Sequence, residues 1–530
     1  QLASGNLDDA ALLTFGLTGA ALTLGDADGI RLTSTGGTLA LAAISAPAPT
    51  SPATDDRRWL SLKGSLTGLG FVGVAGFDLT LSSLALELNR ATGENDPNGT
   101  PASGDEVLAL PLGWTTDLDL DGGGFGGAGD QLTVGSTPMN LAGSLLRASG
   151  TATVNVFDFV AGTVGFTLEQ EQVDLDADGD GDFQPGTILG NNPARGPPDV
   201  AGATLTTLGL TISNVRIGLP SANVGFTVTS GSLDLAVVTA PDASSGASDS
   251  RSWVALKARN LSGSLDGISG FTASGTAVSI DVNRASGSYD PNTGTAADEV
   301  DAFALDWTLA LDRGRNGSFG DAVAVVYAAP ILRAEGTLSL SAFGLLVGNA
   351  HVEVTRRLVD VDVTDGADAQ LLTVGLTALD LRAGRAGFGL HVTAGTIALA
   401  AIAPTAGDLS RRWTTARSVG LAASLTLPGV TAAVSDVAVS VNRATGATVL
   451  NWDTALDLDG GGFGDDLVVA TVPLTLTGGA TRLAGTLTSL VVLDLLNGSA
   501  RFELTFDTVD ADVDGGGKDL DEATLLTIGL

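Results

Sequence analysis

The chain has no cysteine, one methionine and two histidines, and aromatic residues make up only 5% of its 530 residues. Disulfides and thiolate metal sites are therefore excluded. No window holds 18 uninterrupted apolar residues, so the sequence predicts no transmembrane helix. Because large aromatic side chains are few and glycine occurs 72 times, the core must be built from small and aliphatic residues. Such a core is typical of thin, regular β structure.

Positive charge is also scarce, since 26 Lys and Arg face 60 Asp and Glu, for a formal net charge of −34. The negative electrostatic field of such a chain repels phosphate backbones, so nucleic acid is not an expected partner. Cations are the expected partners. Of the acidic residues 50 are Asp and only 10 are Glu, and the Asp gather in Gly-rich turns. This bias indicates turn chemistry and oxygen ligands for hard cations.

Tryptophan marks a long repeat. Three tryptophans are each followed about 30 residues later by an Asn-Arg-Ala phrase, and then by a second tryptophan. The pairs are Trp59 and Trp114, Trp253 and Trp307, and Trp413 and Trp452. We predict three repeats at 1–199, 200–369 and 370–523, with the start of a fourth at 524–530, where TLLTIGL restarts the phrase at Leu12. Their recurrence favours a structural anchor over an exposed platform for sugars.

Short segments such as 151–158, 163–169 and 278–283 alternate between apolar and polar or small residues. This two-residue period predicts half-buried β-strands, and Gly, Asn and Asp punctuate them. A sustained helical period is missing. We therefore predict an all-β chain, built as a repetitive, solenoid-like stack of β units that bury their apolar surface on their neighbours. The alternative is three tandem β-sandwich domains.

Alternating carboxylates in two turns predict calcium binding. Residues 510–521 carry Asp at positions 1, 3 and 5, Gly at position 6 and Asp at position 12 of a calcium-loop pattern. The equivalent turn of the first repeat carries five alternating carboxylates, which repel one another without a cation. The candidate ligands are Asp174, Asp176, Asp178, Asp180 and Asp182, and Asp510, Asp512, Asp514, Asp519 and Asp521. Solvated Asx turns that close strands are the alternative.

A second acidic family follows the later tryptophan of each repeat. Asp117, Asp119 and Asp121 precede one Gly-rich tip, and Asp457 and Asp459 precede another. An acidic hairpin tip without an ion is the simpler interpretation, although Asp457 and Asp459 stay among the candidate ligands. The second repeat has Arg313 and Arg315 in its tip, which indicates that a cation is not needed in every copy.

No Ser-His-Asp, Cys-His, HExxH or Walker phrase is present. The two histidines, His351 and His391, lie in different predicted units, and acidic pairs are too numerous to single out a catalytic dyad. We therefore predict no catalytic residues and no enzymatic activity.

Four motifs together cover nearly the whole chain. They are the Gly-Leu-Thr strands, the Asn-Arg-Ala-Thr-Gly turns, the tryptophan hairpins and the Val-Asp-Leu-Asp-Ala-Asp-Gly turn at 173–179. With these motifs the chain resembles the repeat arrays of giant secreted bacterial surface proteins, including adhesins and extracellular fibre proteins. The resemblance implies an extracellular or cell-surface filament protein that calcium stiffens and that associates with itself end to end or laterally. The alternatives are a carbohydrate-binding surface module, whose partners would be surface glycans, and, less favoured, a β-helical enzyme acting on polysaccharides.

Overall fold

The computed structural model confirms the all-β prediction, with 67% of the chain in strands. The residues that it describes are 7, 10–19, 21–25, 31–72, 77–100, 106–156, 159–181, 183–185, 198–219, 224–243, 247–291, 299–343, 345–362, 369–385, 388–405, 407–458, 461–511 and 520–530. Within them the only helical element is a 3₁₀ turn, η1 (Ala128–Asp130). A helix long and apolar enough to cross a membrane is not found in this part of the chain.

The chain divides into two compact units. The first comprises Gln1–Pro220, Val228–Ala258 and Val282–Pro330, and the second comprises Ser221–Thr227, Arg259–Asp281 and Ile331–Leu530. Three long strands contribute residues to both units: β15 (Val224–Thr239), β17 (Ser252–Ile268) and β18 (Phe271–Ser286).

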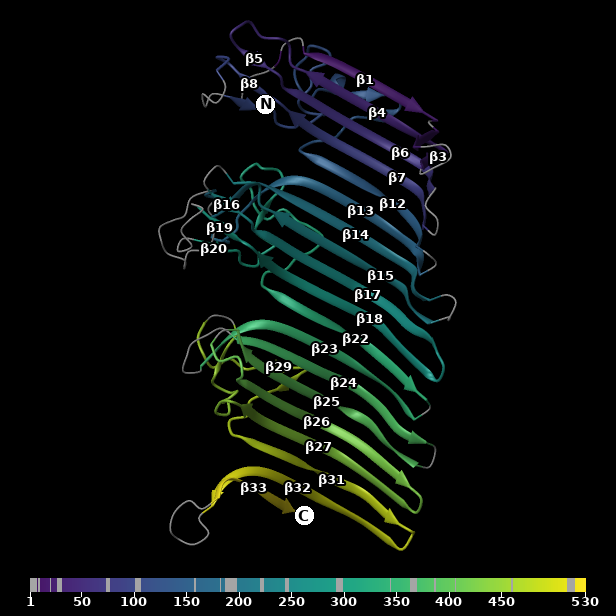
Figure 1. Ribbon diagram of the computed structural model, residues 1–530, viewed down its shortest axis with the longest axis vertical. Helices are drawn as coiled ribbons and strands as arrows, with labels where there is room; N and C mark the ends of the chain where they lie inside the picture. The colour runs from purple at the N-terminus through teal and green to yellow at the C-terminus, as the bar shows by residue number, and fades with distance from the viewer. Residues whose placement is uncertain are drawn as a thin grey trace. The chain divides into compact units, whose positions relative to one another are not determined.

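The first unit is built on consecutive antiparallel pairs of long strands (Figure 1). In order of pairing they are β1 (Ala11–Thr18), β4 (Gly36–Ser45), β6 (Arg58–Val72), β7 (Phe77–Thr92), β12 (Leu145–Val156), β13 (Val160–Leu175) and β14 (Val200–Leu219). A short hairpin, β2 (Leu22–Gly25) and β3 (Arg31–Ser34), pairs with β6 through β3.

Short strands lie within the loops that connect the long strands of the chain. They are β5 (Thr54–Asp55), β8 (Glu94–Asp96) and β9 (Val107–Leu108); β10 (Thr133–Val134) and β11 (Thr137–Pro138); and β16 (Ser248–Asp249), β19 (Ser288–Asp290) and β20 (Val300–Asp301). A further short strand, β21 (Leu311–Asp312), pairs with the end of β13.

The second unit repeats this arrangement. Its antiparallel strands in order of pairing are β22 (Ile331–Ala342), β23 (Leu346–Val361), β24 (Ala369–Arg385), β25 (Phe388–Pro404), β26 (Arg412–Leu427), β27 (Val430–Thr445), β31 (Ala480–Val492), β32 (Leu496–Ala511) and β33 (Leu520–Gly529). The short strand β28 (Leu456–Asp457) pairs with the end of β23, and β29 (Val468–Val469) pairs with β30 (Val472–Pro473).

Three hydrophobic cores lie beside these strands, and each contains two of the six tryptophans. All six indoles are at most 2% exposed, so they are anchors of the cores and none is available to stack on a sugar. The second core begins at Val173 and the third at Val359. Each of these cores therefore includes the last strand residues of the preceding predicted repeat.

A buried asparagine explains the Asn-Arg-Ala phrase. The side-chain amide of Asn89 donates to the carbonyls of Leu112 and Gly143 at 2.8 and 2.7 Å, and the indole of Trp114 donates to Asn89 Oδ1 at 2.8 Å. Asn283 and Asn442 accept the same bond from Trp307 and Trp452, at 2.9 and 3.0 Å. One asparagine thus holds a strand, a loop and an indole together in each copy, which we call the Asn–Trp bracket.

The first tryptophan of each pair carries a cation on its face. The guanidinium groups of Arg57, Arg251 and Arg411, each two residues before that tryptophan, lie 5.5 to 5.7 Å from the ring centres. Arg57 and Arg251 also pair with the nearby Asp55 and Asp249, each at 2.7 Å. Each pair therefore satisfies a nearly buried guanidinium while it stacks on the indole.

Candidate metal centre

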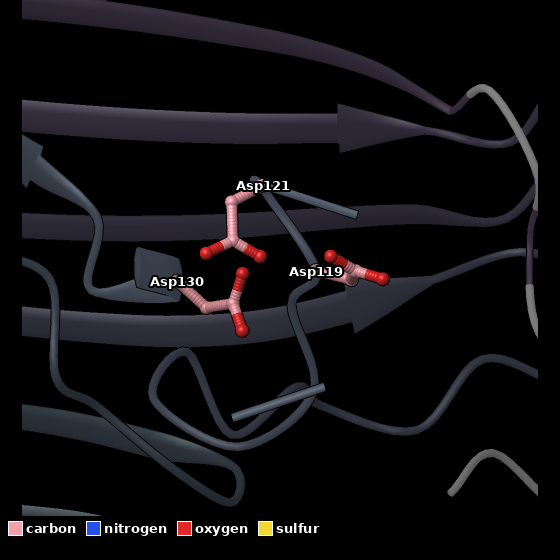
Figure 2. A group of neighbouring side chains, drawn as sticks. All are labelled: Asp119, Asp121 and Asp130. Atoms are coloured by element: carbon pink, nitrogen blue, oxygen red, sulfur yellow. The ribbon is translucent and has the colours of Figure 1, made fainter. Parts of the chain in front are cut away.

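Two groups of three aspartates come together in the described part of the chain. Within each group, one carboxylate oxygen per residue lies within 4.8 Å of the others. The groups are Asp119, Asp121 and Asp130, and Asp176, Asp178 and Asp199. Figure 2 shows the carboxylates of Asp121 and Asp130 pointing toward one another, with Asp119 beside them. Carboxylate oxygens gathered in this way are the donor set that hard cations such as Ca²⁺ prefer.

Backbone amides of glycine fix the first carboxylate of each group. Asp176 accepts N–H bonds from Gly179 and Gly181 at 2.7 and 3.0 Å. Asp119 accepts the equivalent bonds, from the residues three and five positions later, at 2.6 and 3.2 Å. Gly179 and Gly181 have φ of +75° and +83°, a conformation that glycine adopts without strain. The glycines therefore shape the turn so that the first carboxylate faces its interior.

A second aspartate closes each turn from further along the chain. Asp199 accepts the N–H groups of Ala177 and Gln184 at 2.8 and 2.6 Å. Asp130 does the same with Leu120 and Gly127, at 2.5 and 2.7 Å. In both turns the closing carboxylate thus accepts from the residue directly after the first aspartate. Asp130, Asp176 and Asp199 are buried, at 0%, 3% and 5% exposure.

The same turn occurs in two further places. Asp312 accepts from Gly317 at 2.6 Å and Asp457 accepts from Gly462 at 2.9 Å, in each case five residues later. Their closing aspartates are Asp321, which accepts from Arg313 at 2.8 Å, and Asp465, which accepts from Leu458 at 2.6 Å. The first-repeat turn at 174–182 and the turns of the second acidic family therefore share one pattern in the part of the chain that the structure describes.

The structure brings two of the predicted ligands of the first repeat together, Asp176 and Asp178. Asp174 instead accepts from the backbone of Gly202 at 2.8 Å and from Arg315 Nε at 3.0 Å. The N–H of Asp180 donates to Asp178 at 3.2 Å, and Asp180 is not in the three-residue group. Asp199 and Asp130 were not predicted. The signal that identifies them is the hydrogen bond to the residue after the first aspartate, which sequence spacing does not show.

The other predicted ligands are described only in part. Asp457 lies at the end of β28 in the turn given above, whereas Asp182, Asp459, Asp512, Asp514 and Asp519 lie outside the described residues. The backbones of Asp510 and Asp521 belong to β32 and β33. Calcium binding by the turn at 510–521 therefore stays a prediction.

Strand pairing places the end of one repeat beside the tip of the next. In the first unit Asp174 lies opposite Asp312 in the β13–β21 pair, and in the second unit Asp360 lies opposite Asp457 in the β23–β28 pair. Like charges directly opposite one another in a sheet repel. At the first of these junctions Arg315 Nε, 3.0 Å from Asp174 Oδ1, offsets part of this repulsion.

Burial and neighbouring carboxylates shift the pKa values of the Asp176 group. Burial raises the pKa of Asp178 to about 6, and Asp180, Asp199 and Asp176 add repulsion. Burial also raises the pKa of Asp199, against the two N–H groups that it accepts. By contrast, the N–H of Leu120 lowers the pKa of Asp130. The Asp176 group therefore resists full ionisation unless a cation is present.

This shift predicts how stability depends on pH. In the presence of a chelator, we expect the free energy of unfolding to fall as the pH rises from about 4 to about 6. Between these values the folded state keeps a proton on Asp178 that the unfolded chain, with an ordinary Asp pKa of 3.8, has lost. Urea denaturation at several pH values measures this slope. Asp178→Asn should flatten it, and an equal slope in that variant would contradict the assignment.

No family model matches this chain, and no curated protein or solved structure matches it either.

Proposed function

We propose that this protein is a structural, non-catalytic repeat protein of a bacterial cell surface or extracellular filament or adhesin, made rigid by calcium at its Asp-rich turns. The observation that carries the proposal is the Asn–Trp bracket, which recurs three times with the same hydrogen bonds. A recurrent scaffold of this kind is typical of proteins whose function is length and display.

The chemistry of the turns supports the calcium part of the proposal. Three carboxylates of the Asp176 group lie within one ion's reach, two of them are buried, and the pKa of Asp178 is raised. A divalent cation offsets the repulsion and links the end of β13 to the segment before β14 that contains Asp199. In this proposal calcium stiffens the connections between successive strands, and self-association end to end or laterally builds the filament.

Small-angle X-ray scattering with and without a chelator tests the proposal. We expect an elongated particle in calcium, and a broader distribution of distances after chelation because the turns loosen. Asp199→Asn in calcium should reproduce part of the effect of the chelator. Asp242→Asn is the matched control. It removes the same charge, but from an exposed residue in the loop after β15. A compact particle, or scattering that calcium does not change, would contradict the proposal.

A further inference from the structure

Asp312 has a buried carboxylate oxygen that nothing in the protein satisfies. The residue is 0% exposed at the end of β21, and its Oδ2 accepts the N–H of Gly317. Its Oδ1 is buried and has no hydrogen-bond partner in the described part of the chain. A buried, unpaired carboxylate oxygen is costly, because it has lost water without gaining a donor. Such an oxygen therefore requires an explanation.

The equivalent aspartates of the two three-carboxylate groups have both oxygens satisfied. Asp119 and Asp176 each accept from the backbone three residues later as well as five residues later. In the 312–321 turn the residue three positions later is Arg315, at a φ of +49°, and its N–H does not reach Asp312. The oxygen nevertheless faces the inside of the turn, since a Cβ on Gly314 would lie 3.7 Å from it.

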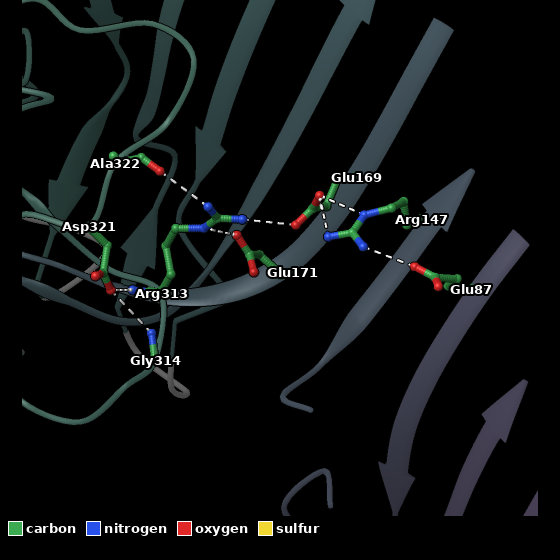
Figure 3. A network of polar contacts seen from close by, with 8 residues as sticks. All are labelled: Glu87, Arg147, Glu169, Glu171, Arg313, Gly314, Asp321 and Ala322. Carbon is green, nitrogen blue, oxygen red and sulfur yellow. Dashed lines mark hydrogen bonds and ion pairs between the residues drawn. The ribbon is translucent and has the colours of Figure 1, made fainter. Parts of the chain in front are cut away.

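The two arginines of this turn are engaged elsewhere. Figure 3 shows Arg313 reaching Glu169 and Glu171 on β13 and the carbonyl of Ala322. Its Nη2 lies 2.8 Å from Glu169 Oε1. Arg315 pairs through its Nε with Asp174 Oδ1 at 3.0 Å. Neither guanidinium therefore neutralises Asp312, although both arginines lie within three residues of it in the sequence.

The charges around the turn leave a surplus of negative charge. Arg147, Arg313 and Arg315 pair with Glu169, Glu171 and Asp174 on β13, while Asp312 and Asp321 add two carboxylates that form no ion pair in the described residues. Asp174 also lies directly opposite Asp312 in the β13–β21 pair. Within the turn, the oxygen of Asn316 accepts the N–H of Ser318 at 2.9 Å, and its amide nitrogen lies on the side of Gly314. The surroundings are thus rich in oxygen and short of positive charge.

We propose that the 312–321 turn is a cation site of its own, in which Asp312 Oδ1 binds a small, hard cation, Ca²⁺ or Na⁺. Asp321, whose Oδ2 accepts the N–H groups of Arg313 and Gly314, is the second oxygen donor of the same turn. The site is separate from the Asp176 group and does not depend on calcium binding there. The turn lacks a carboxylate at the third position, where Gly314 replaces Asp178, so its affinity for calcium is expected to be lower than that of the Asp176 group.

Hydrogen exchange read by mass spectrometry tests this site locally. The intact protein is freed of metals in tetramethylammonium chloride, and CaCl₂ or NaCl is then added in separate arms. We expect amides in peptides covering 312–321 to exchange about tenfold more slowly at a cation concentration ten times the Kd. An effect in the calcium arm alone identifies a divalent site, and an effect in both arms identifies a site that also takes sodium. If neither salt slows the wild-type peptide, the proposal is wrong.

Two variants separate this site from its neighbour. In Asp176→Asn the added cation should still slow exchange at 312–321, whereas in Asp312→Asn this slowing should be lost and the protection of the 176–184 region retained. Equal slowing in Asp312→Asn and wild type would overturn the proposal, as would its loss in Asp176→Asn. Because loss of calcium binding at Asp176 alone leaves the 312–321 response intact, failure of the proposed function and failure of this site are distinguishable.

Discussion

Replacing Asn89 with leucine is expected to lower the free energy of unfolding by about 2–6 kcal/mol, because two buried groups and one partly buried carbonyl lose their hydrogen-bond partner at once. Asn89 is 0% exposed. Its side chain accepts from the indole of Trp114 and donates to the carbonyls of Leu112 and Gly143. Leucine has the same number of side-chain heavy atoms and the same branch at Cγ, so it opens no cavity and removes the polar bracket. Urea denaturation followed by tryptophan fluorescence measures it.

The same Asn-Arg phrase supplies the matched control. Arg90 is the next residue and is exposed, so Arg90→Leu should change the free energy of unfolding by no more than about 0.5 kcal/mol. Asn283→Leu and Asn442→Leu should show losses as large as that of Asn89→Leu, since each side chain also accepts from its indole and donates to at least two backbone carbonyls. If the Asn89 and Arg90 substitutions had equal effects, the Asn–Trp bracket would not be a stabilising feature of the fold.

The strands could be predicted from the sequence because their signal is local. Alternation along 163–169 reflects the two faces of β13, and glycine and aspartate mark where the strands end. The recurrence of the Asn-Arg-Ala phrase also indicated a framework position. Its physical reason could not be predicted, because the bond from Trp114 to Asn89 joins residues 25 positions apart and depends on how a loop folds back on a strand.

The candidate metal sites could be predicted only where the ligands are close in the sequence. Asp176 and Asp178 lie in one turn, whereas Asp174 belongs to β13, which ends at Leu175. The alternating aspartates of the sequence therefore do not all face the same turn. The closing aspartate lies 23 residues after Asp176 and 11 after Asp119. This variable distance hides Asp199 and Asp130 from any search by spacing. The meeting of Asp174 and Asp312 depends on a pairing between strands that are far apart in the chain.

Removing calcium is expected to lower the melting temperature of the first unit by about 4 °C for each occupied site, and by about twice that for both. Both three-aspartate groups lie in this unit. At a calcium concentration 100 times the Kd, each site contributes about 2.7 kcal/mol, because calcium binds the folded state and not the unfolded one. A unit of this size converts about 2.7 kcal/mol into about 4 °C. Differential scanning calorimetry in calcium and in a chelator measures the shift.

The variant Asp178→Asn tests the direction of the change in melting temperature as well as its size. In a chelator at pH 7 the variant should melt above the wild type, since the raised pKa of Asp178 means that its charge opposes folding when no cation is bound. In calcium the order should reverse, because the variant has lost a ligand. Asp242→Asn should leave the order of melting unchanged in both buffers. A variant that melts below the wild type in both would mean that Asp178 has only a structural role in an Asx turn, and the calcium assignment of this group would be wrong.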